Sequence, residues 1–380
     1  MLVWFGLISY PLYLWHWPIL SFIRILEPMP IGPMGRIGAI ILAVALAWAT
    51  YVLVEKPIRF SRPRPWKIGG LCAALALIGA VGVATFERKG FPGREVVEMN
   101  PHADSAFHGI GHEYVVYECG VAKQDKDALD NCFRDARQPA RYALWGDSKA
   151  DALYWGLVRE SAADERWMFI GNTVPVLSDE PIYGEMARKN QIALKAIVDN
   201  PDIEAVALVT ALRQLFRIER DDSVEELASS PYYSEPLAGL TRSIKALRNA
   251  GKKVVFVVDN PTLPTPKDCM TDRVTSSRAF NAILSHRENP RCKIGYQRHL
   301  ELTEKYRRLV ADLKRLNPEL IVYDPTHLLC DIPRNVCAIS ANRNFLYSYA
   351  DHISDYASSL IAKELLPMMK AAVGPRKEAP

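Results

Sequence analysis

Charged residues are absent from three long stretches of this 380-residue chain, 2–23, 37–54 and 68–86. Each stretch is close to the ~20 residues that a helix needs to cross the apolar core of a bilayer. The first lacks the basic start and the small-residue cleavage site of a secretory signal peptide. We therefore expect residues 1–86 to form a membrane segment of three transmembrane helices, with the lipid bilayer as a partner.

Long basic runs are also absent, and the net charge is only +4. These two absences exclude nucleic acid as an expected partner, because its phosphate backbone requires a sustained basic surface. The chain contains neither a P-loop nor a dinucleotide-binding glycine pattern, and no cysteine pair has the close C-x-x-C spacing of a zinc knuckle. The sequence therefore implies no metal and no nucleotide cofactor.

Six of the seven cysteines follow residue 100 and fall into three local pairs, whereas Cys72 lies in the third apolar stretch. The pairs are Cys119 with Cys132, Cys269 with Cys292, and Cys330 with Cys337. An even number in local pairs favours disulfides and an oxidising compartment. The alternative is a cytosolic domain with six buried free thiols.

The charges of the short linkers predict an orientation in the membrane. Residues 55–67 carry five Lys or Arg against one Glu, and the linker at 27–36 is much less basic. Short basic loops stay in the cytoplasm. The chain after residue 87 is therefore expected outside the inner membrane, which agrees with the paired cysteines.

Beyond residue 136, short apolar runs alternate with helical stretches. The predicted strands are 142–145, 167–170, 205–209, 253–258 and 320–323, and the predicted helices end near 161, 199, 250, 316 and 370. This alternation is typical of an α/β domain with a parallel sheet covered on both faces. We place this domain at 136–373, after an irregular periplasmic entry segment at 87–135 and before a tail at 374–380.

A tight turn, Gly146-Asp147-Ser148, follows the first predicted strand of this domain. It lifts a serine hydroxyl to the carboxyl end of the strand, where open α/β sheets bind ligands and where the N–H groups of the next helix converge. Such a hydroxyl becomes a nucleophile when an imidazole takes its proton. The alternative is that Ser148 only caps its helix, since Asp and Ser are both favoured N-caps.

His352 is the histidine with the most informative neighbours, because Asp351 precedes it and Ser354 follows two residues later. We expect His352 to meet Ser148 in space, although about two hundred residues separate them. The alternative is a helix cap or a surface histidine.

Several motifs resemble known families. Gly146-Asp147-Ser148 and Asp351-His352-Ile353-Ser354 resemble the first and last sequence blocks of the SGNH hydrolases. The chain is more closely similar to the C-terminal part of bacterial acyltransferase-3 membrane proteins with a fused SGNH domain. Residues 8–18, 51–59 and 329–331 carry this second resemblance. It implies a flavodoxin-like, three-layer SGNH domain.

The resemblance also implies a role for each block. Ser148 would be the nucleophile and His352 the general base of an SGNH-type acyltransferase or esterase. The expected reaction is periplasmic O-acyl transfer, typically of acetyl, to a glycan such as lipopolysaccharide O-antigen, peptidoglycan or an exopolysaccharide. The acyl group, derived from acetyl-CoA, would come from a membrane acyltransferase core at the bacterial inner membrane.

The membrane segment resembles only the last two helices of such a core and one linking helix. We therefore expect a truncated, split or decayed copy, for which the missing N-terminal acyltransferase helices are a further partner. Two rival hypotheses follow: a catalytically decayed, membrane-anchored glycan-binding or scaffold module, and a partner subunit of a split acyltransferase.

Three positions depart from the family pattern. Lys149 stands where the family has His, and Tyr349 stands where its Asp lies three residues before the His. Asp351 is then the near carboxylate and the third candidate catalytic residue, although the side chains of adjacent residues point different ways. A backbone carbonyl is the alternative.

The third departure concerns the oxyanion site. Thr210 opens the loop where the family has its oxyanion Asn. Gly171 matches the family's second-block Gly, and Gly171 with Asn172 supplies an N–H and an amide for the oxyanion, with a plain turn as the alternative. Arg213, in the same loop as Thr210, is expected to be solvated or to bind an anionic sugar.

Overall fold

The structure is a computed structural model with two compact units. It describes residues 2–26, 32–59, 65–88, 90–91, 112–119, 121, 125, 129, 131–137, 139–162, 165–178, 180, 183–218, 224–263, 292–342, 344–349 and 351–375. The described residues up to 91 belong to the first unit, and those from 112 onward belong to the second.

The first unit is helical. Its elements are α1 (Leu2–Leu26), α2 (Pro33–Thr50), the π-helical turn Tyr51–Glu55, α3 (Lys56–Arg59) and α4 (Pro65–Glu87). α1 packs on α2, where Ala39, Ala43 and Ala47 are buried at intervals of one helical turn. Small residues at this spacing let two helices approach closely.

Two helical stretches of this unit, Pro33–Arg59 and Ile68–Glu87, are long and apolar enough to cross a bilayer, judged by length and composition alone. The first predicted span forms α1, which contains Pro11 and Pro18. A membrane segment of three spans therefore stays a prediction.

The second unit is built on a seven-stranded sheet with the order β1-β2-β4-β3-β5-β6-β8. Its parallel strands are β3 (Tyr142–Gly146), β4 (Trp167–Gly171), β5 (Ala205–Val209), β6 (Lys253–Val257) and β8 (Ile321–Tyr323). All residues of β3, β4 and β5 are buried, as expected for strands covered on both faces. The predicted α/β class and the mostly parallel sheet are confirmed.

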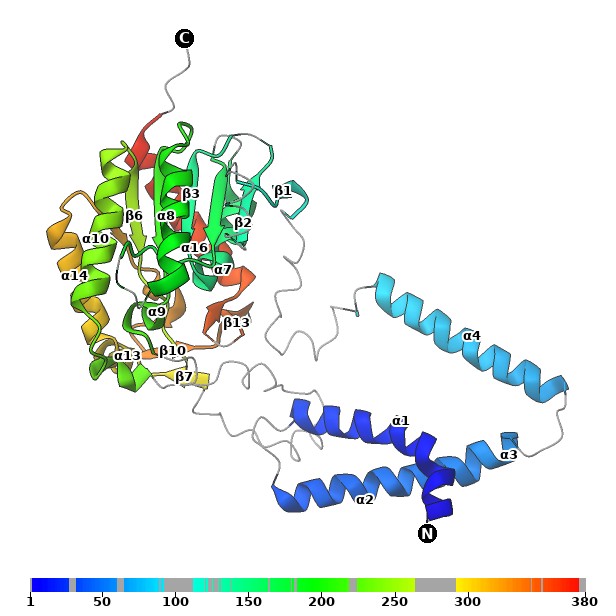
Figure 1. The fold of residues 1–380 in the computed structure, drawn as a ribbon. Coiled ribbons are helices and arrows are strands. Elements are labelled where there is room, and N and C mark those ends of the chain that lie inside the picture. Colours follow the sequence, from blue (N-terminus) through cyan, green and yellow to red (C-terminus); the bar gives the residue numbers. More distant parts are fainter. Residues whose placement is uncertain are drawn as a thin grey trace. The chain divides into compact units, whose positions relative to one another are not determined.

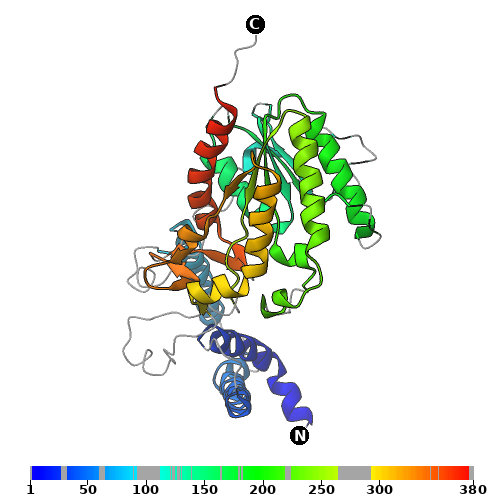
Figure 2. The same cartoon turned by 90° about the vertical axis from the view of Figure 1, so that its left-hand side faces the viewer.

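Helices cover both faces of this sheet (Figures 1 and 2). One face carries α8 (Gly184–Val198), α10 (Ser234–Asn249) and α14 (Glu304–Leu316), and the other carries α7 (Ser148–Glu160) and α16 (Asp355–Val373). Side chains alternate between the faces along each strand. Ala143 and Trp145 thus pack with the helices of the first face, while Tyr142 and Leu144 point to the second.

The entry segment differs from the prediction. Within it, β1 (Val115–Val116) pairs with β2 (Asn131–Asp135), and β2 adds to the sheet antiparallel to β4. Phe133 anchors β2, because its ring contacts Tyr117 at 4.8 Å and Phe169 at 5.5 Å between centroids. A five-residue strand with two charged or amide ends lacks the apolar run that sequence patterns detect, so irregular structure was the wrong expectation here.

Short elements surround the carboxyl edge of the sheet. They are α9 (Leu212–Phe216), η5 (Val224–Ala228), β7 (Lys293–Ile294), α13 (Tyr296–Leu302), α15 (Thr326–Leu329), β9 (Cys330–Asp331), β10 (Val336–Ala338), β11 (Ser340–Ala341), β12 (Asn344–Phe345), β13 (Tyr347–Tyr349) and β14 (His352–Ile353), whereas η3 (His112–Tyr114) precedes β1 at the opposite edge. β7, β10 and β9 form one small sheet, and β13 and β14 form a hairpin.

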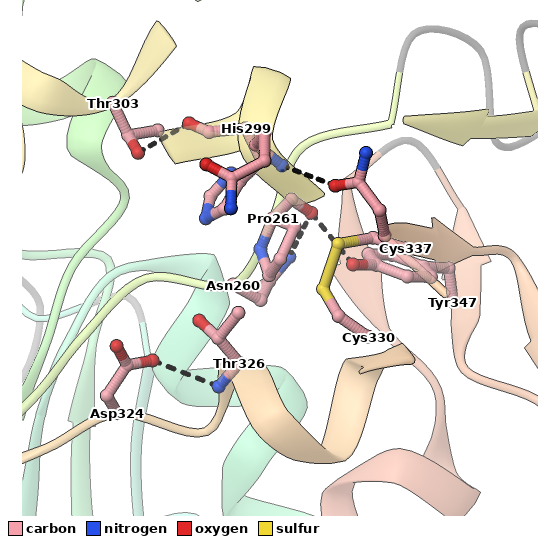
Figure 3. Close-up of a disulfide and its surroundings, with 11 residues drawn as sticks. Asn260, Pro261, His299, Thr303, Asp324, Thr326, Cys330, Cys337 and Tyr347 are labelled. Carbon is pink, nitrogen blue, oxygen red and sulfur yellow. Dashed lines mark hydrogen bonds between the residues drawn. A yellow bond between two sulfur atoms is a disulfide. The ribbon is translucent and has the colours of Figure 1, made fainter. Parts of the chain in front are cut away.

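Disulfides join two of the predicted cysteine pairs, Cys119–Cys132 and Cys330–Cys337. Cys292 is also disulfide-bonded, and its predicted partner Cys269 lies outside the described residues. Figure 3 shows Cys330–Cys337 beside Pro261 and Tyr347, whose hydroxyl donates to the Pro261 carbonyl at 2.9 Å. The disulfide therefore braces β9 and β10 next to the loop that follows β6.

A buried histidine in this region makes the fold acid-sensitive. His299 on α13 is 7% exposed, and burial lowers its pKa to about 4 because the imidazolium would lose its hydration. The folded state thus binds this proton more weakly than the unfolded state. Stability from this group is complete above about pH 6.5 and is lost as the pH falls toward 4.

We expect the free energy of unfolding to fall by about 2–3 kcal/mol across this window through His299 alone. His299→Gln should remove most of that pH dependence. Urea unfolding of both proteins at pH 7 and pH 4.5 measures it, and parallel losses in the two proteins would show that another group is responsible.

Candidate active site

The turn after β3 frees the Ser148 hydroxyl. Gly146 ends the strand against the carbonyl oxygen of Val209, where a Cβ atom has no room. Asp147 is the N-cap of α7 and accepts the backbone N–H of Lys149 at 2.9 Å. The cap is therefore Asp147 and not Ser148, which begins the helix with an exposed side chain.

The position of this turn in the sheet matches a ligand site. β3 lies between β4 and β5, and the chain continues to β4 on one side before it adds β5 on the other. Loops at such a switch point diverge at the carboxyl ends of the strands and leave a crevice. Ser148 lies at this switch point.

The structure brings His352 to Ser148. The imidazole Nε2 of His352 lies 2.8 Å from the Ser148 hydroxyl oxygen. His352 is buried in β14, opposite Tyr349 in the hairpin. A separation of 2.8 Å is within the range in which a base can take a hydroxyl proton.

The helices that follow the two residues hold this pair together. α16 starts just after His352 at its N-cap Ser354, and it packs along α7, which starts at Ser148. Gly156 of α7 donates its backbone N–H to the hydroxyl of Ser358 at 2.9 Å. The close approach leaves no space for a side chain at residue 156, so the contact fixes the spacing of the two helices.

Asp351, the third candidate catalytic residue, reaches the imidazole although it is adjacent to His352 in the sequence. Its Oδ1 lies 3.2 Å from Nδ1 of His352, a close contact that becomes an ion pair when the imidazole is protonated. Burial by itself raises the pKa of the Asp351 carboxyl, but Lys149 and Arg213 hold it well below its ordinary range. Asp351 therefore presents a permanent negative charge beside the ring.

Lys149 supplies one of the two cations. Its ammonium nitrogen lies 3.1 Å from the carboxylates of Asp351 and Asp259 and donates to the Asn260 side chain at 3.1 Å. It also donates to the Asp351 backbone carbonyl at 2.6 Å. Burial lowers the pKa of Lys149, but the two carboxylates outweigh it and raise the pKa above its ordinary value.

Arg213 supplies the second cation. Its guanidinium forms a short ion pair with Oδ2 of Asp351, and its side chain is only 13% exposed. The expectation of a solvated arginine is therefore wrong, and the binding of an anionic sugar stays a prediction. Thr210, in the same loop, is fully buried and donates to Asp147 at 3.1 Å.

Gly171 and Asn172 lie at the same edge of the sheet. Gly171 ends β4, and Asn172 follows it with a left-handed φ of 54° and an exposed side chain. The next residue, Thr173, donates its N–H to the Gly146 carbonyl at 3.2 Å. This bond ties the turn after β4 to the turn that carries Ser148.

Sequence reasoning missed Asp259 and Asn260. Both are buried directly after β6, where Asp259 accepts the Leu212 N–H at 2.9 Å and Asn260 donates to the Asp351 carbonyl at 2.8 Å. Two polar residues at the end of an apolar strand were the available signal. Adjacent Asp and Asn are also common in plain turns, so the pattern did not distinguish a functional site from a turn.

The fold and the Ser–His geometry are those of an SGNH hydrolase-like domain. A family model described as an SGNH domain, fused to AT3 domains, matches residues 118–367. The chain therefore belongs to this family of SGNH domains. A comparison with curated proteins finds no match.

Two solved structures are similar to the chain at low identity. One is a proposed acylhydrolase from Bacteroides fragilis NCTC 9343, with 11% identity, a TM-score of 0.34, and coverage of 62% of this chain and 88% of that one. The other is a GDSL-like lipase from Bacteroides thetaiotaomicron VPI-5482, with 9% identity, a TM-score of 0.32, and coverage of 60% and 88%.

Proposed function

We propose that this protein transfers an acyl group through Ser148, with His352 as the general base and Asp351 as the carboxylate that stabilises the imidazolium. The 2.8 Å contact between Ser148 and His352 carries this proposal. Membership of a family of SGNH domains supports chemistry on ester bonds, by transfer or by hydrolysis.

Each step follows from the positions of these groups. The Ser148 oxygen attacks the acyl carbonyl carbon while its proton passes to Nε2 of His352. The oxygen of the donor then leaves with that proton, and the acyl group remains on Ser148. In the second half, His352 takes a proton from an acceptor hydroxyl, whose oxygen attacks the ester carbonyl. His352 then returns that proton to the Ser148 oxygen as it leaves.

In both halves of the reaction, negative charge develops on the carbonyl oxygen and needs hydrogen-bond donors to stabilise it. Those proposed are the N–H group of Ser148 at the start of α7, since the N–H of Lys149 is bonded to Asp147, and the side-chain amide of Asn172 at the same sheet edge. A helix N-terminus favours an anion, and a donor of this kind contributes about 3–4 kcal/mol to a transition state.

The proposed acceptor is a glycan hydroxyl and the proposed acyl group is acetyl. The two apolar helical stretches support attachment to a membrane, and the disulfides support an oxidising compartment such as the periplasm. The acyl group would come from acetyl-CoA through an acyltransferase-3 membrane core. That core would be supplied by a partner chain or by further acyltransferase helices.

The rival proposal of a decayed module rests on Tyr349 and Thr210. The contacts of Asp351 weaken this rival, because the adjacent carboxylate serves the imidazole in place of a residue at 349. Thr210 is occupied by Asp147, but Asn172 stands on the neighbouring turn as an alternative donor.

The test is an acyl-transfer assay with the full chain in detergent, p-nitrophenyl acetate as donor and a chemically de-O-acetylated lipopolysaccharide O-antigen as acceptor. We expect Ser148-dependent release of p-nitrophenol together with new O-acetyl groups on the glycan, detected by proton NMR. Release without glycan acetylation would restrict the activity to hydrolysis. Equal release by the wild type and Ser148→Ala would favour the decayed module.

A further inference from the structure

The residue after the serine places a buried cation among three loops. Lys149 is 4% exposed, and its backbone belongs to the first turn of α7, next to Ser148. Its ammonium group contacts Asp259 and Asn260 in the loop after β6, and Asp351 in the β13–β14 hairpin. One side chain thus connects the turn of the proposed nucleophile to the loop of the proposed base.

Two of these contacts fix different parts of Asp351. The ammonium nitrogen is 3.1 Å from Oδ2 of the carboxylate and donates to the backbone carbonyl at 2.6 Å. The other carboxylate oxygen faces the imidazole of His352 at 3.2 Å. Lys149 therefore helps to fix both the backbone of the hairpin, together with Asn260, and the orientation of its carboxylate, together with Arg213.

The charges around Lys149 keep it ionised. Asp147, Asp259 and Asp351 face it from the turns after β3 and β6 and from the hairpin. Arg213 of α9 approaches Asp351 and repels Lys149. An ammonium ion is buried at great cost unless such anions surround it. The cluster thus retains a charged lysine rather than a neutral amine.

We propose that Lys149 is a positioning residue of this site, whose ammonium group holds the Asp351 carboxylate and the His352 loop in reach of Ser148. It acts through Asp351 and not on the reacting atoms. This inference rests on the proposed function, because it assigns the residue a part in the reactivity of Ser148. A displacement of about 1 Å at such a site can cost a factor of about 10² in rate.

The chain offers a matched control in a second buried lysine. Lys252 is 7% exposed and donates to the backbone carbonyls of Asn200 and Ile203 at 2.7 and 2.8 Å. It precedes β6 at the amino end of the strand, opposite the edge that carries Ser148. Lys149→Met and Lys252→Met both remove a buried ammonium ion, but only the first lies at the site.

The experiment measures how fast a fluorophosphonate labels Ser148 in the full chain in detergent, by intact mass. In this reaction the serine oxygen displaces fluoride at phosphorus and its proton leaves through His352. We expect Lys149→Met to label about 10- to 100-fold more slowly than the wild type, and Lys252→Met to stay within about twofold. With p-nitrophenyl acetate, Lys149→Met should lower kcat by a similar factor and leave KM within about twofold.

A conservative pair covers the case in which Lys149→Met does not fold. Lys149→Arg keeps the charge, whereas Lys149→Gln keeps only a hydrogen-bond donor, so Lys149→Arg should label faster. The reverse order overturns the inference, and so does equal labelling of Lys149→Met and Lys252→Met. A wild type that labels at Ser148 but does not turn over esters overturns the proposed function alone. A wild type that is not labelled at Ser148 overturns both the inference and the proposed function.

Discussion

Replacing Ser148 by Ala is expected to lower kcat for ester cleavage by at least about 10³-fold. The hydroxyl lies 2.8 Å from the imidazole of His352, and the variant removes the atom that forms the acyl intermediate. Losses of this size follow when a nucleophile of a Ser–His pair is deleted, because oxyanion donors and binding alone retain a small part of the catalysis. The release of p-nitrophenol from p-nitrophenyl acetate measures the effect.

The chain again contains a matched control. Ser234 is the first residue of α10, just as Ser148 is the first residue of α7, and it is exposed. Ser234→Ala should leave the rate unchanged. His352→Ala should lose about as much as Ser148→Ala, and the double variant should lose little more, because the two groups act in one step. Additive losses would contradict a shared step.

Replacing Asp147 by Ala is expected to lower the free energy of unfolding by about 3–5 kcal/mol. The carboxylate is 7% exposed and accepts three bonds, from the N–H groups of Lys149 and Ala211 and from the hydroxyl of Thr210. The variant leaves three donors without this acceptor and removes the cap of α7. Urea unfolding at pH 7 measures the loss.

Asp147→Asn provides the comparison. The amide keeps one oxygen that can accept, so its loss should be less than half of that in Asp147→Ala. Circular dichroism establishes that each variant folds before unfolding is measured. Similar stability of wild type and Asp147→Ala would mean that water replaces the carboxylate, and the turn would then not depend on this cap.

Local patterns in the sequence predicted the frame of the site well. Gly146-Asp147-Ser148 lies between a continuous apolar run and an amphipathic stretch, so both the strand and the helix could be read from their periods. The parallel direction of the strands could also be predicted, because each apolar run is separated from the next by a helix. These features depend on neighbours within a few residues, which a sequence displays directly.

The contacts that hold the imidazole of His352 in place could not be predicted from such local patterns. The rule that adjacent side chains diverge holds for extended strands, but Asp351 lies in the turn before β14, and the hairpin register shifts between Tyr347 and Tyr349. The partners of Lys149 follow β6, more than a hundred residues further along the chain. Contacts that depend on such separations emerge only when the sheet brings the loops together.

Acyl transfer through Ser148 is tested most directly by identifying the residue that carries the acyl group. The full chain is mixed with p-nitrophenyl acetate, quenched in acid within the first turnover, digested and analysed by mass spectrometry. We predict one acetyl group on the peptide that contains Ser148, and none on that peptide in Ser148→Ala. Turnover with the acetyl group on another residue, or without any acetylated peptide in a trapped first turnover, would contradict a mechanism that passes through Ser148.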